Sequence, residues 1–276
     1  SEFATGVKEP GLGQVVDILS ESSKLTVAAM FGTTFGGGFE VALGCNYRIA
    51  LKGSKIGLPE VKLGIIPGAQ GTQRLPRVAD LEFSLNLMSS GNPVSAEQAL
   101  AAGAIDRIAE EDVVEEAVVF ANELLGSGAP LRKTQEMVVD PDKYNADFFA
   151  RFRQTIARRT RGMNSPERAI RAAEAAVNCS FPDGVDFEKQ MSKECGADPQ
   201  SKALQHVFFA ERLANKVPGL AKDSPIKEIK SVGIIGAGTM GGGIAMNFAN
   251  VGIPVTLLEM NPETLDKGLG VVKRNY

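Results

Sequence analysis

Histidine and cysteine are scarce in this sequence of 276 residues. The single histidine, His206, gives a Ser/His/Asp triad or a multi-histidine metal site at most one candidate residue. The three cysteines, Cys45, Cys179 and Cys195, are far apart and odd in number, which argues against a disulfide framework and against a zinc site. We therefore expect no metal, a structural role for His206 and a reducing compartment.

The sequence also lacks long apolar runs and a strong excess of charge of either sign. No run reaches the ~18 residues that a membrane span requires, and no signal-peptide pattern opens the chain. A net charge of −3 gives no support for a nucleic-acid partner, which requires a broad basic surface. A local cluster of arginines could meet phosphate, but we expect a solvated helical face paired with nearby acids. Its members are Arg151, Arg153, Arg158, Arg159, Arg161, Arg168 and Arg171.

The spacing of apolar residues changes along the chain. Between residues 24 and 108, short β-like runs alternate with helical ones, and glycines and prolines separate them. From Glu111 onward, apolar residues recur at three- and four-residue spacing, as in "SPERAIRAAEAAVN", which predicts helices. The segment "VPGLAKDSPIKE" is typical of a linker. The sequence therefore predicts an α/β fold followed by helices, with one or two domains in all.

Three consecutive glycines, residues 36–38, stand just before Glu40 at the predicted start of a helix. Such a start offers amides without acceptors and the positive end of the helix dipole, and glycine lets a ligand approach the backbone. Glu60, in "GLPEVKLGIIPG", could meet Glu40 at one bound molecule, with one acid acting as base and the other as proton donor. The pattern alone is also consistent with purely structural roles. The glycines could allow a helix and a strand to pack closely, Glu40 could complement the helix dipole, and Glu60 could be a surface acid in a loop.

The run "TVAAMFGTTFGGGFEVALGCNYRIALKGSKIGLPEVKLGIIPGAQGTQRLPRV" resembles the signature region of the enoyl-CoA hydratase (crotonase) family without a gap. In that family the glycine matching Gly37 donates an oxyanion-hole hydrogen bond to a thioester oxygen, and the two glutamates match Glu40 and Glu60. The resemblance implies a crotonase-like ββα spiral with C-terminal helices, an acyl-CoA thioester as substrate and no cofactor for hydration. Both acids are present, which favours hydration over the isomerases and hydrolases of this fold that lack one.

Two departures from the family pattern affect this interpretation. Gln70 stands in "GAQG" where the family usually has glycine, and we expect it to alter the acyl pocket or the position of a water molecule. The other oxyanion donor of the family and part of its CoA-binding loop lie upstream of where Ser1 aligns. We therefore expect the hydratase part to be truncated at its N-terminus.

A dinucleotide fingerprint lies in "SVGIIGAGTMGGGIAMNFANVGIPVTLLEMN". A short apolar strand leads into Gly236, Gly238 and Gly241 in GxGxxG spacing, then a helix, then a second strand ending at Glu259. These glycines permit a tight turn, approach of a pyrophosphate and close helix packing, in that order, and the acid binds the ribose hydroxyls. Because an acid repels a 2'-phosphate, we expect NAD and the first βαβ unit of a Rossmann domain. A glycine-rich turn in another α/β domain is the alternative.

The order of these parts resembles the family of bifunctional β-oxidation enzymes, enoyl-CoA hydratase/3-hydroxyacyl-CoA dehydrogenase. The resemblance implies a hydratase domain at residues 1–185, linking helices at 186–226 and the start of an NAD-binding domain at 227–276. It implies hydration of 2-enoyl-CoA to 3-hydroxyacyl-CoA, with NAD-dependent oxidation to 3-ketoacyl-CoA in the complete protein, in the cytoplasm or, in a eukaryote, the peroxisome. Two alternatives stay open: a non-catalytic acyl-CoA-binding fragment, and an isomerase acting mainly on 3-enoyl-CoA. An oligomer is possible, and neither its size nor the preferred acyl chain length is predicted.

Overall fold

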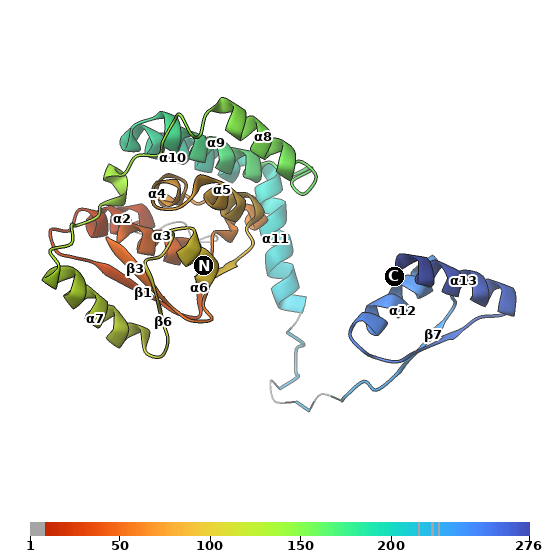
Figure 1. Ribbon diagram of the computed structural model, residues 1–276. Helices are drawn as coiled ribbons and strands as arrows, with labels where there is room; N and C mark the ends of the chain where they lie inside the picture. The colour runs from red at the N-terminus through yellow and green to blue at the C-terminus, as the bar shows by residue number, and fades with distance from the viewer. Residues whose placement is uncertain (1–8, 215, 222–223, 226) are drawn as a thin grey trace. The chain divides into compact units, whose positions relative to one another are not determined.

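The computed structural model describes residues 9–214, 216–221, 224–225 and 227–276. The chain divides into two compact units, residues 1–215 and 216–276, and Figure 1 labels their elements. Helix α10 (Phe181–Ala197) runs without a break across residue 185, where the sequence predicts the end of the hydratase domain. The two compact units do not test the predicted domain limits at residues 185 and 226, which stay predictions. Within the described ranges, no helix is both long enough and apolar enough to cross a bilayer.

Two small sheets form the base of the first unit. In one, β1 (Val27–Met30), β3 (Tyr47–Leu51) and β6 (Arg107–Ala109) are parallel, in the order β1-β3-β6. In the other, β2 (Thr33–Phe35) pairs in parallel with β4 (Lys55–Gly57), which pairs in antiparallel with β5 (Val94–Ser95).

The strands follow a repeating order along the chain. Strands β1 and β2 lead into α3 (Gly37–Gly44), and strands β3 and β4 lead into the 3-10 helix η1 (Pro59–Leu63). Each of these two ββα repeats has its first strand in the sheet β1-β3-β6 and its second strand in the sheet β2-β4-β5. This repeat confirms the predicted ββα spiral, and it places the three glycines and Glu60 at equivalent points, where the second strand of each unit ends.

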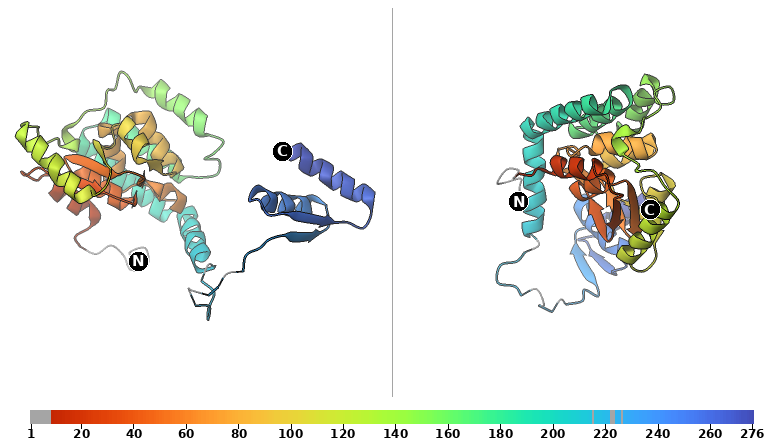
Figure 2. Two further views of the ribbon diagram at one scale, coloured as in Figure 1. Left: turned by 60° about the horizontal axis from the view of Figure 1, so that its bottom comes forward. Right: turned by 90° about the vertical axis from the view of Figure 1, so that its left-hand side faces the viewer.

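Helices pack around these sheets. The remaining elements of the first unit are α2 (Leu12–Ser20), α4 (Gly71–Val78), α5 (Leu81–Ser90), α6 (Ala96–Ala101), α7 (Val113–Gly126), η2 (Thr134–Glu136), α8 (Ala146–Ile156), α9 (Ser165–Asn178) and α11 (Pro199–Ala214). Helix α9 lies against α4, α5 and α10 (Figure 1), and Figure 2 shows this stack from two further sides. The alanines of "RAIRAAEAAV" are buried on α9, and their small side chains let the neighbouring helices approach closely.

The exposed side of the same region carries the basic cluster. Arg153 contacts Glu167 at 3.0 Å and Glu174 at 2.8 Å. Arg168 contacts Asp198 at 2.7 Å. These ion pairs confirm the predicted pairing with nearby acids for the two arginines, whose side chains are half-buried rather than fully solvated.

The second unit is one βαβ unit followed by a helix. Strands β7 (Val232–Ile235) and β8 (Val255–Leu258) are parallel, with α12 (Thr239–Asn250) between them, and α13 (Pro262–Asn275) follows. This order confirms the predicted βαβ unit. A Cβ added to Gly241 would lie 1.8 Å from the Gly236 carbonyl oxygen, whereas one added to Gly243 would meet no atom within 4 Å.

These two glycines give a matched test of the second unit. We expect Gly241→Ala to destabilise it by about 3 kcal/mol, because neither backbone segment can move away without breaking the turn. Gly243→Ala should instead stabilise α12 by up to about 1 kcal/mol, since alanine is the better helix former. Amide hydrogen exchange in β7 and β8 measures both effects. Equal exchange in the two variants would contradict the close packing.

Candidate active site

The N-terminus of α3 is shaped by Gly36. This residue has φ +55°, in the left-handed region that favours glycine, and its carbonyl accepts from the amides of Phe39 and Glu40 at 2.8 and 3.0 Å. The amides of Gly37 and Gly38 are therefore the first of the helix and have no intrahelical acceptor. A Cβ on Gly36 would lie 2.7 Å from Glu60 Oε1, which shows how closely that carboxyl group approaches the helix start.

Glu40 is buried beneath this helix start, with 3% of its surface exposed. Its Oε1 accepts both the Ala69 amide at 2.8 Å and the Gly71 amide at 2.9 Å. Burial raises the pKa of Glu40 to about 7, and the two hydrogen bonds oppose that rise. Within the described part of the chain Oε2 has no hydrogen-bond donor, which leaves one oxygen available to a ligand or water.

Glu60 comes from the first turn of η1, directly after Pro59. Its Oε2 is buried and has no hydrogen-bond partner among the residues that the structure describes. Burial, together with the charges of Glu40 and Glu188, raises the pKa of Glu60 to about 8. The structure thus brings Gly37, Glu40 and Glu60 together at one helix start, as the sequence predicted, and their catalytic roles stay a prediction.

Helix α2 lies over part of this site. A Cβ on Gly37 would be 2.5 Å from Leu12 Cδ2, which places the leucine against the helix start. One cavity of about 520 Å³ is lined by residues of α2, by Gly68 and Gln70, and by α10. A second, of about 370 Å³, lies between β1 and α3 and is lined in part by Gly38. Neither cavity is lined by Glu40 or Glu60.

Gln70 adopts φ +75°, which explains why a glycine suits this turn in the family pattern. Its Nε2 donates to Asp17 Oδ1 on α2 at 2.6 Å, and its Oε1 accepts from Arg74 Nε at 2.8 Å. The side chain therefore ties the turn to α2 and α4. An effect of Gln70 on the acyl pocket stays a prediction.

Glu188 on α10 is a third buried carboxyl group at this site, and the sequence analysis missed it. It accepts from the Gln70 amide at 2.7 Å and from the Thr72 amide at 3.0 Å. A signal was present in the sequence. Glu188 shares the buried face of α10 with Val185, Met191 and Cys195, at the three- and four-residue spacing of an apolar stripe. An acid in such a stripe predicts a buried, compensated charge.

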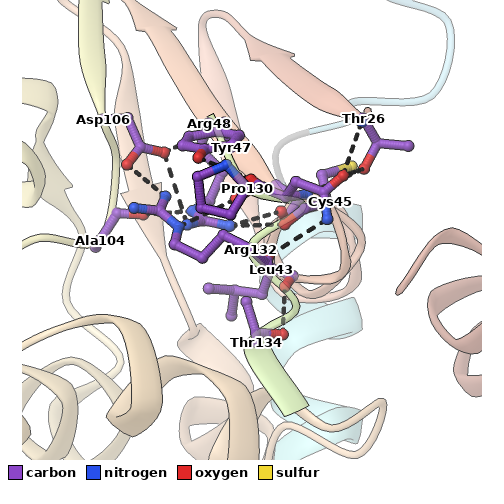
Figure 3. Close-up of polar contacts among 12 residues, drawn as sticks. Thr26, Leu43, Cys45, Tyr47, Arg48, Ala104, Asp106, Pro130, Arg132 and Thr134 are labelled. Carbon is purple, nitrogen blue, oxygen red and sulfur yellow. Dashed lines mark hydrogen bonds and ion pairs between the residues drawn. The ribbon is translucent and has the colours of Figure 1, made fainter. Parts of the chain in front are cut away.

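The far end of α3 is held by a network around Arg48 (Figure 3). Arg48 is fully buried, and its guanidinium donates to the carbonyls of Cys45 at 3.0 Å and Ala104 at 2.9 Å. Asp106 forms ion pairs with both Arg48 and Arg132. Burial lowers the pKa of Arg48 to about 10, and the Asp106 charge opposes this. The network fixes the C-terminal end of α3 and thereby the position of Glu40 at its start.

The predicted dinucleotide residues also lie together. Gly236 has φ +97°, and a Cβ on Gly238 would meet no atom within 4 Å, so a pyrophosphate has room to approach. Glu259 accepts from the Ala237 amide at 2.7 Å, and this hydrogen bond lowers the pKa of its carboxyl group. A cavity of about 520 Å³ is lined by Gly238, Glu259 and residues of α12 and α13. The turn therefore fits a dinucleotide, and the binding roles of the four residues stay a prediction.

His206 lies exposed on α11, and a structural role for it stays a prediction. Across the described ranges, no group of three or more His, Cys, Asp or Glu side chains is arranged to hold a metal ion.

Comparison with known proteins gives two family matches. Residues 4–147 match the enoyl-CoA hydratase/isomerase family, and residues 231–276 match the NAD binding domain of 3-hydroxyacyl-CoA dehydrogenase. The second match confirms the expectation of NAD as the cofactor type of this segment.

Three individual proteins illustrate the similarity. The peroxisomal bifunctional enzyme of Cavia porcellus is 39% identical over 268 residues, which cover 96% of this chain and 36% of that protein. A peroxisomal fatty acid beta-oxidation multifunctional protein of Arabidopsis thaliana is 35% identical, covering 98% of this chain and 38% of that protein. The crystal structure of carnitinyl-CoA hydratase from Mycobacterium avium is 24% identical, covers 68% of this chain and 60% of that one, and has a TM-score of 0.47. The chain thus spans less than two fifths of the length of these curated relatives.

Proposed function

Because the chain belongs to the enoyl-CoA hydratase/isomerase family, we propose that it hydrates 2-enoyl-CoA thioesters to 3-hydroxyacyl-CoA. The observation that supports this most directly is the meeting of Glu40 and Glu60, both with raised pKa values, at a helix start whose first amides have no acceptor within the helix. A general base and a general acid at neutral pH require two carboxyl groups in different protonation states, and these environments supply them.

The proposed reaction adds water across the C2–C3 double bond. One glutamate takes a proton from water while the hydroxyl bonds to C3, and the other glutamate gives a proton to C2. The conjugated system passes negative charge to the thioester oxygen as an enolate, and the Gly37 amide stabilises it there. The two carboxyl groups exchange protonation states in one turnover, and proton exchange with solvent restores them. We assign neither acid a fixed role, because close carboxyl groups titrate as a pair.

The activity should depend on pH as a bell-shaped curve. Below the lower pKa of about 7 both acids are protonated and no base remains, and above the higher pKa of about 8 both are ionised and no proton donor remains. We therefore expect kcat/KM, which reports the pKa values of the chain without substrate, to be greatest between these values. Initial rates of crotonyl-CoA hydration at substrate concentrations well below KM, from pH 5.5 to 9.5, measure this. A rate that keeps rising from pH 7 to 9.5 would contradict a shared proton.

The direct test of the proposed function is the loss of the conjugated-enoyl absorbance of crotonyl-CoA. One observation favours a second candidate, an acyl-CoA-binding chain without turnover: Leu12 lies against Gly37, and neither neighbouring cavity reaches the two acids. Binding of crotonyl-CoA in calorimetry with no loss of absorbance would support this second candidate. A parallel assay with a 3-enoyl-CoA measures isomerisation, and faster conversion of that substrate would make the chain mainly an isomerase.

For the second unit we propose a role in the NAD-dependent step of fatty acid β-oxidation. When bound, NAD would supply the hydride acceptor that turns a 3-hydroxyacyl-CoA into a 3-ketoacyl-CoA. The chain's own contribution is the open backbone at Gly238 for the pyrophosphate and Glu259 for the ribose hydroxyls. The names of both relatives also support a peroxisomal location.

A further inference from the structure

Four consecutive amides, at residues 69–72, donate alternately to two buried carboxyl groups. The first and third donate to Glu40 Oε1, at 2.8 and 2.9 Å. The second and fourth donate to the two oxygens of Glu188, at 2.7 and 3.0 Å, and the Thr72 hydroxyl adds a further bond to Glu188 at 2.6 Å. The turn is therefore held on one side from α3 and on the other from α10.

We propose that Glu188 is a positioning residue for hydration: by holding the second and fourth amides of the turn, it fixes the first and third, which orient Glu40. The inference rests on the proposed function. Glu188 also lines the cavity of about 520 Å³ beside α2, and the role proposed for it acts through the turn. Both amides that reach Glu40 bind the same oxygen, so the direction of its other oxygen depends on where the turn lies. A displacement of about 1 Å at such a group can lower a rate by 10²-fold.

Glu188 is suited to this role by burial and by its chemistry. It is 0% exposed, and its neighbours Val185, Met191 and Cys195 anchor the same face of α10, so the carboxyl group cannot move unless the helix does. Both oxygens of Glu188 face the three donors of the turn, and when the carboxyl group is protonated the Thr72 hydroxyl can accept its proton instead of donating. In Glu188→Gln only one oxygen remains as an acceptor. The amide nitrogen would face a donor of the turn, so at least one of these hydrogen bonds would be lost.

The charges that face Glu188 come from three elements: Glu40 on α3, Glu60 on η1 and Arg74 on α4. Burial, together with the Glu40 charge, raises the pKa of Glu188 to about 8, against the opposing effect of the hydrogen bonds from the turn. The charge of Glu188 in turn raises the pKa of Glu60. Removing that charge should therefore lower the pKa of Glu60.

The test compares Glu188→Ala and Glu188→Gln with Glu194→Gln, a control on the exposed side of the same helix. We expect Glu188→Ala to lower kcat for crotonyl-CoA by about 10²-fold with little change in KM, because the change misplaces the base or acid rather than removing a group that binds the thioester. In Glu188→Gln the alkaline limb of the pH profile should move to lower pH. A role in stability alone would move neither the pH profile nor the ratio of kcat to KM. Unchanged kcat and an unchanged profile in both variants would overturn the proposal.

Amide hydrogen exchange gives a readout that needs no activity. In Glu188→Ala, the amides of Ala69 and Gly71 should exchange faster than in the unmodified chain or in Glu194→Gln, although neither amide contacts Glu188. If only Gln70 and Thr72 lose protection, Glu188 does not position Glu40 and the inference is wrong. A chain that fails to hydrate crotonyl-CoA would refute the proposed function instead, and the exchange of Ala69 and Gly71 would still decide the role of Glu188.

Discussion

Replacing either Glu40 or Glu60 with glutamine is expected to lower kcat for crotonyl-CoA hydration by about 10²- to 10⁴-fold, since each change removes one partner in proton transfer. The fold should tolerate both changes. Glu40 Oε1 accepts both of the hydrogen bonds from the turn, and a glutamine carbonyl oxygen accepts two as well. At Glu60 the buried Oε2 has no partner to lose. Rates from crotonyl-CoA absorbance, with circular dichroism as a check on folding, measure the effect.

The double variant should be little slower than the slower single variant, because the two acids act as a unit and one alone cannot complete the proton transfers. Glu82→Gln is the matched control, since Glu82 is exposed on α5. We expect its rate to equal that of the unmodified chain. If Glu40→Gln and Glu60→Gln both keep the full rate in folded protein, the two glutamates are not the catalytic pair.

The second large effect is expected from Gly36→Ala. A Cβ at this position would lie 2.7 Å from Glu60 Oε1, so the carboxyl group must move away from the helix start. We expect the rate of crotonyl-CoA hydration to fall on the order of 10²-fold, because a displaced acid no longer meets the reacting atoms. The alanine must also adopt φ +55° with ψ −127°, a combination that is nearly restricted to glycine and costs about 1–3 kcal/mol of stability.

Gly32→Ala separates these two causes. Gly32 has φ +63°, similar to Gly36, but a Cβ there meets no atom within 4 Å. Both variants should lose stability in thermal unfolding because of the positive φ, and Gly36→Ala should lose more because of its overlap with Glu60. Only Gly36→Ala should lose activity. Equal rates in the two variants would mean that the position of Glu60 does not limit the reaction.

The sequence predicted the helix start with its two acids because both lie within short, continuous patterns. Three glycines just before Glu40 and a glutamate after Pro59 are local signals, and each marks the end of the second strand in a ββα unit. Glu188 could not be placed in this way, because the amides that it accepts are 118 and 116 residues away in the sequence. Only the packing of α10 against α4 brings them together.

Gln70 shows a second limit. The departure from glycine was visible in the sequence, but its consequence was not, since the left-handed backbone and the bonds to Asp17 and Arg74 depend on helices α2 and α4. The contacts of a side chain that bridges three elements are determined by tertiary packing and cannot be predicted from the local sequence. The contact of Leu12 with the start of α3 could not be predicted either, because nothing in the local sequence pattern of α2 indicates that it packs against Gly37.

The three buried carboxyl groups also affect how the chain responds to denaturation. Glu40, Glu60 and Glu188 have pKa values of about 7, 8 and 8 in the folded chain, against an ordinary value of 4.5. Between pH 4.5 and these values the folded chain holds more protons than the unfolded one, so stability falls as the pH rises from about 4.5 to 8 and levels off above the folded-state pKa values. Unfolding near neutral pH therefore releases protons to the buffer, and the measured enthalpy of unfolding will depend on the ionisation enthalpy of the buffer chosen.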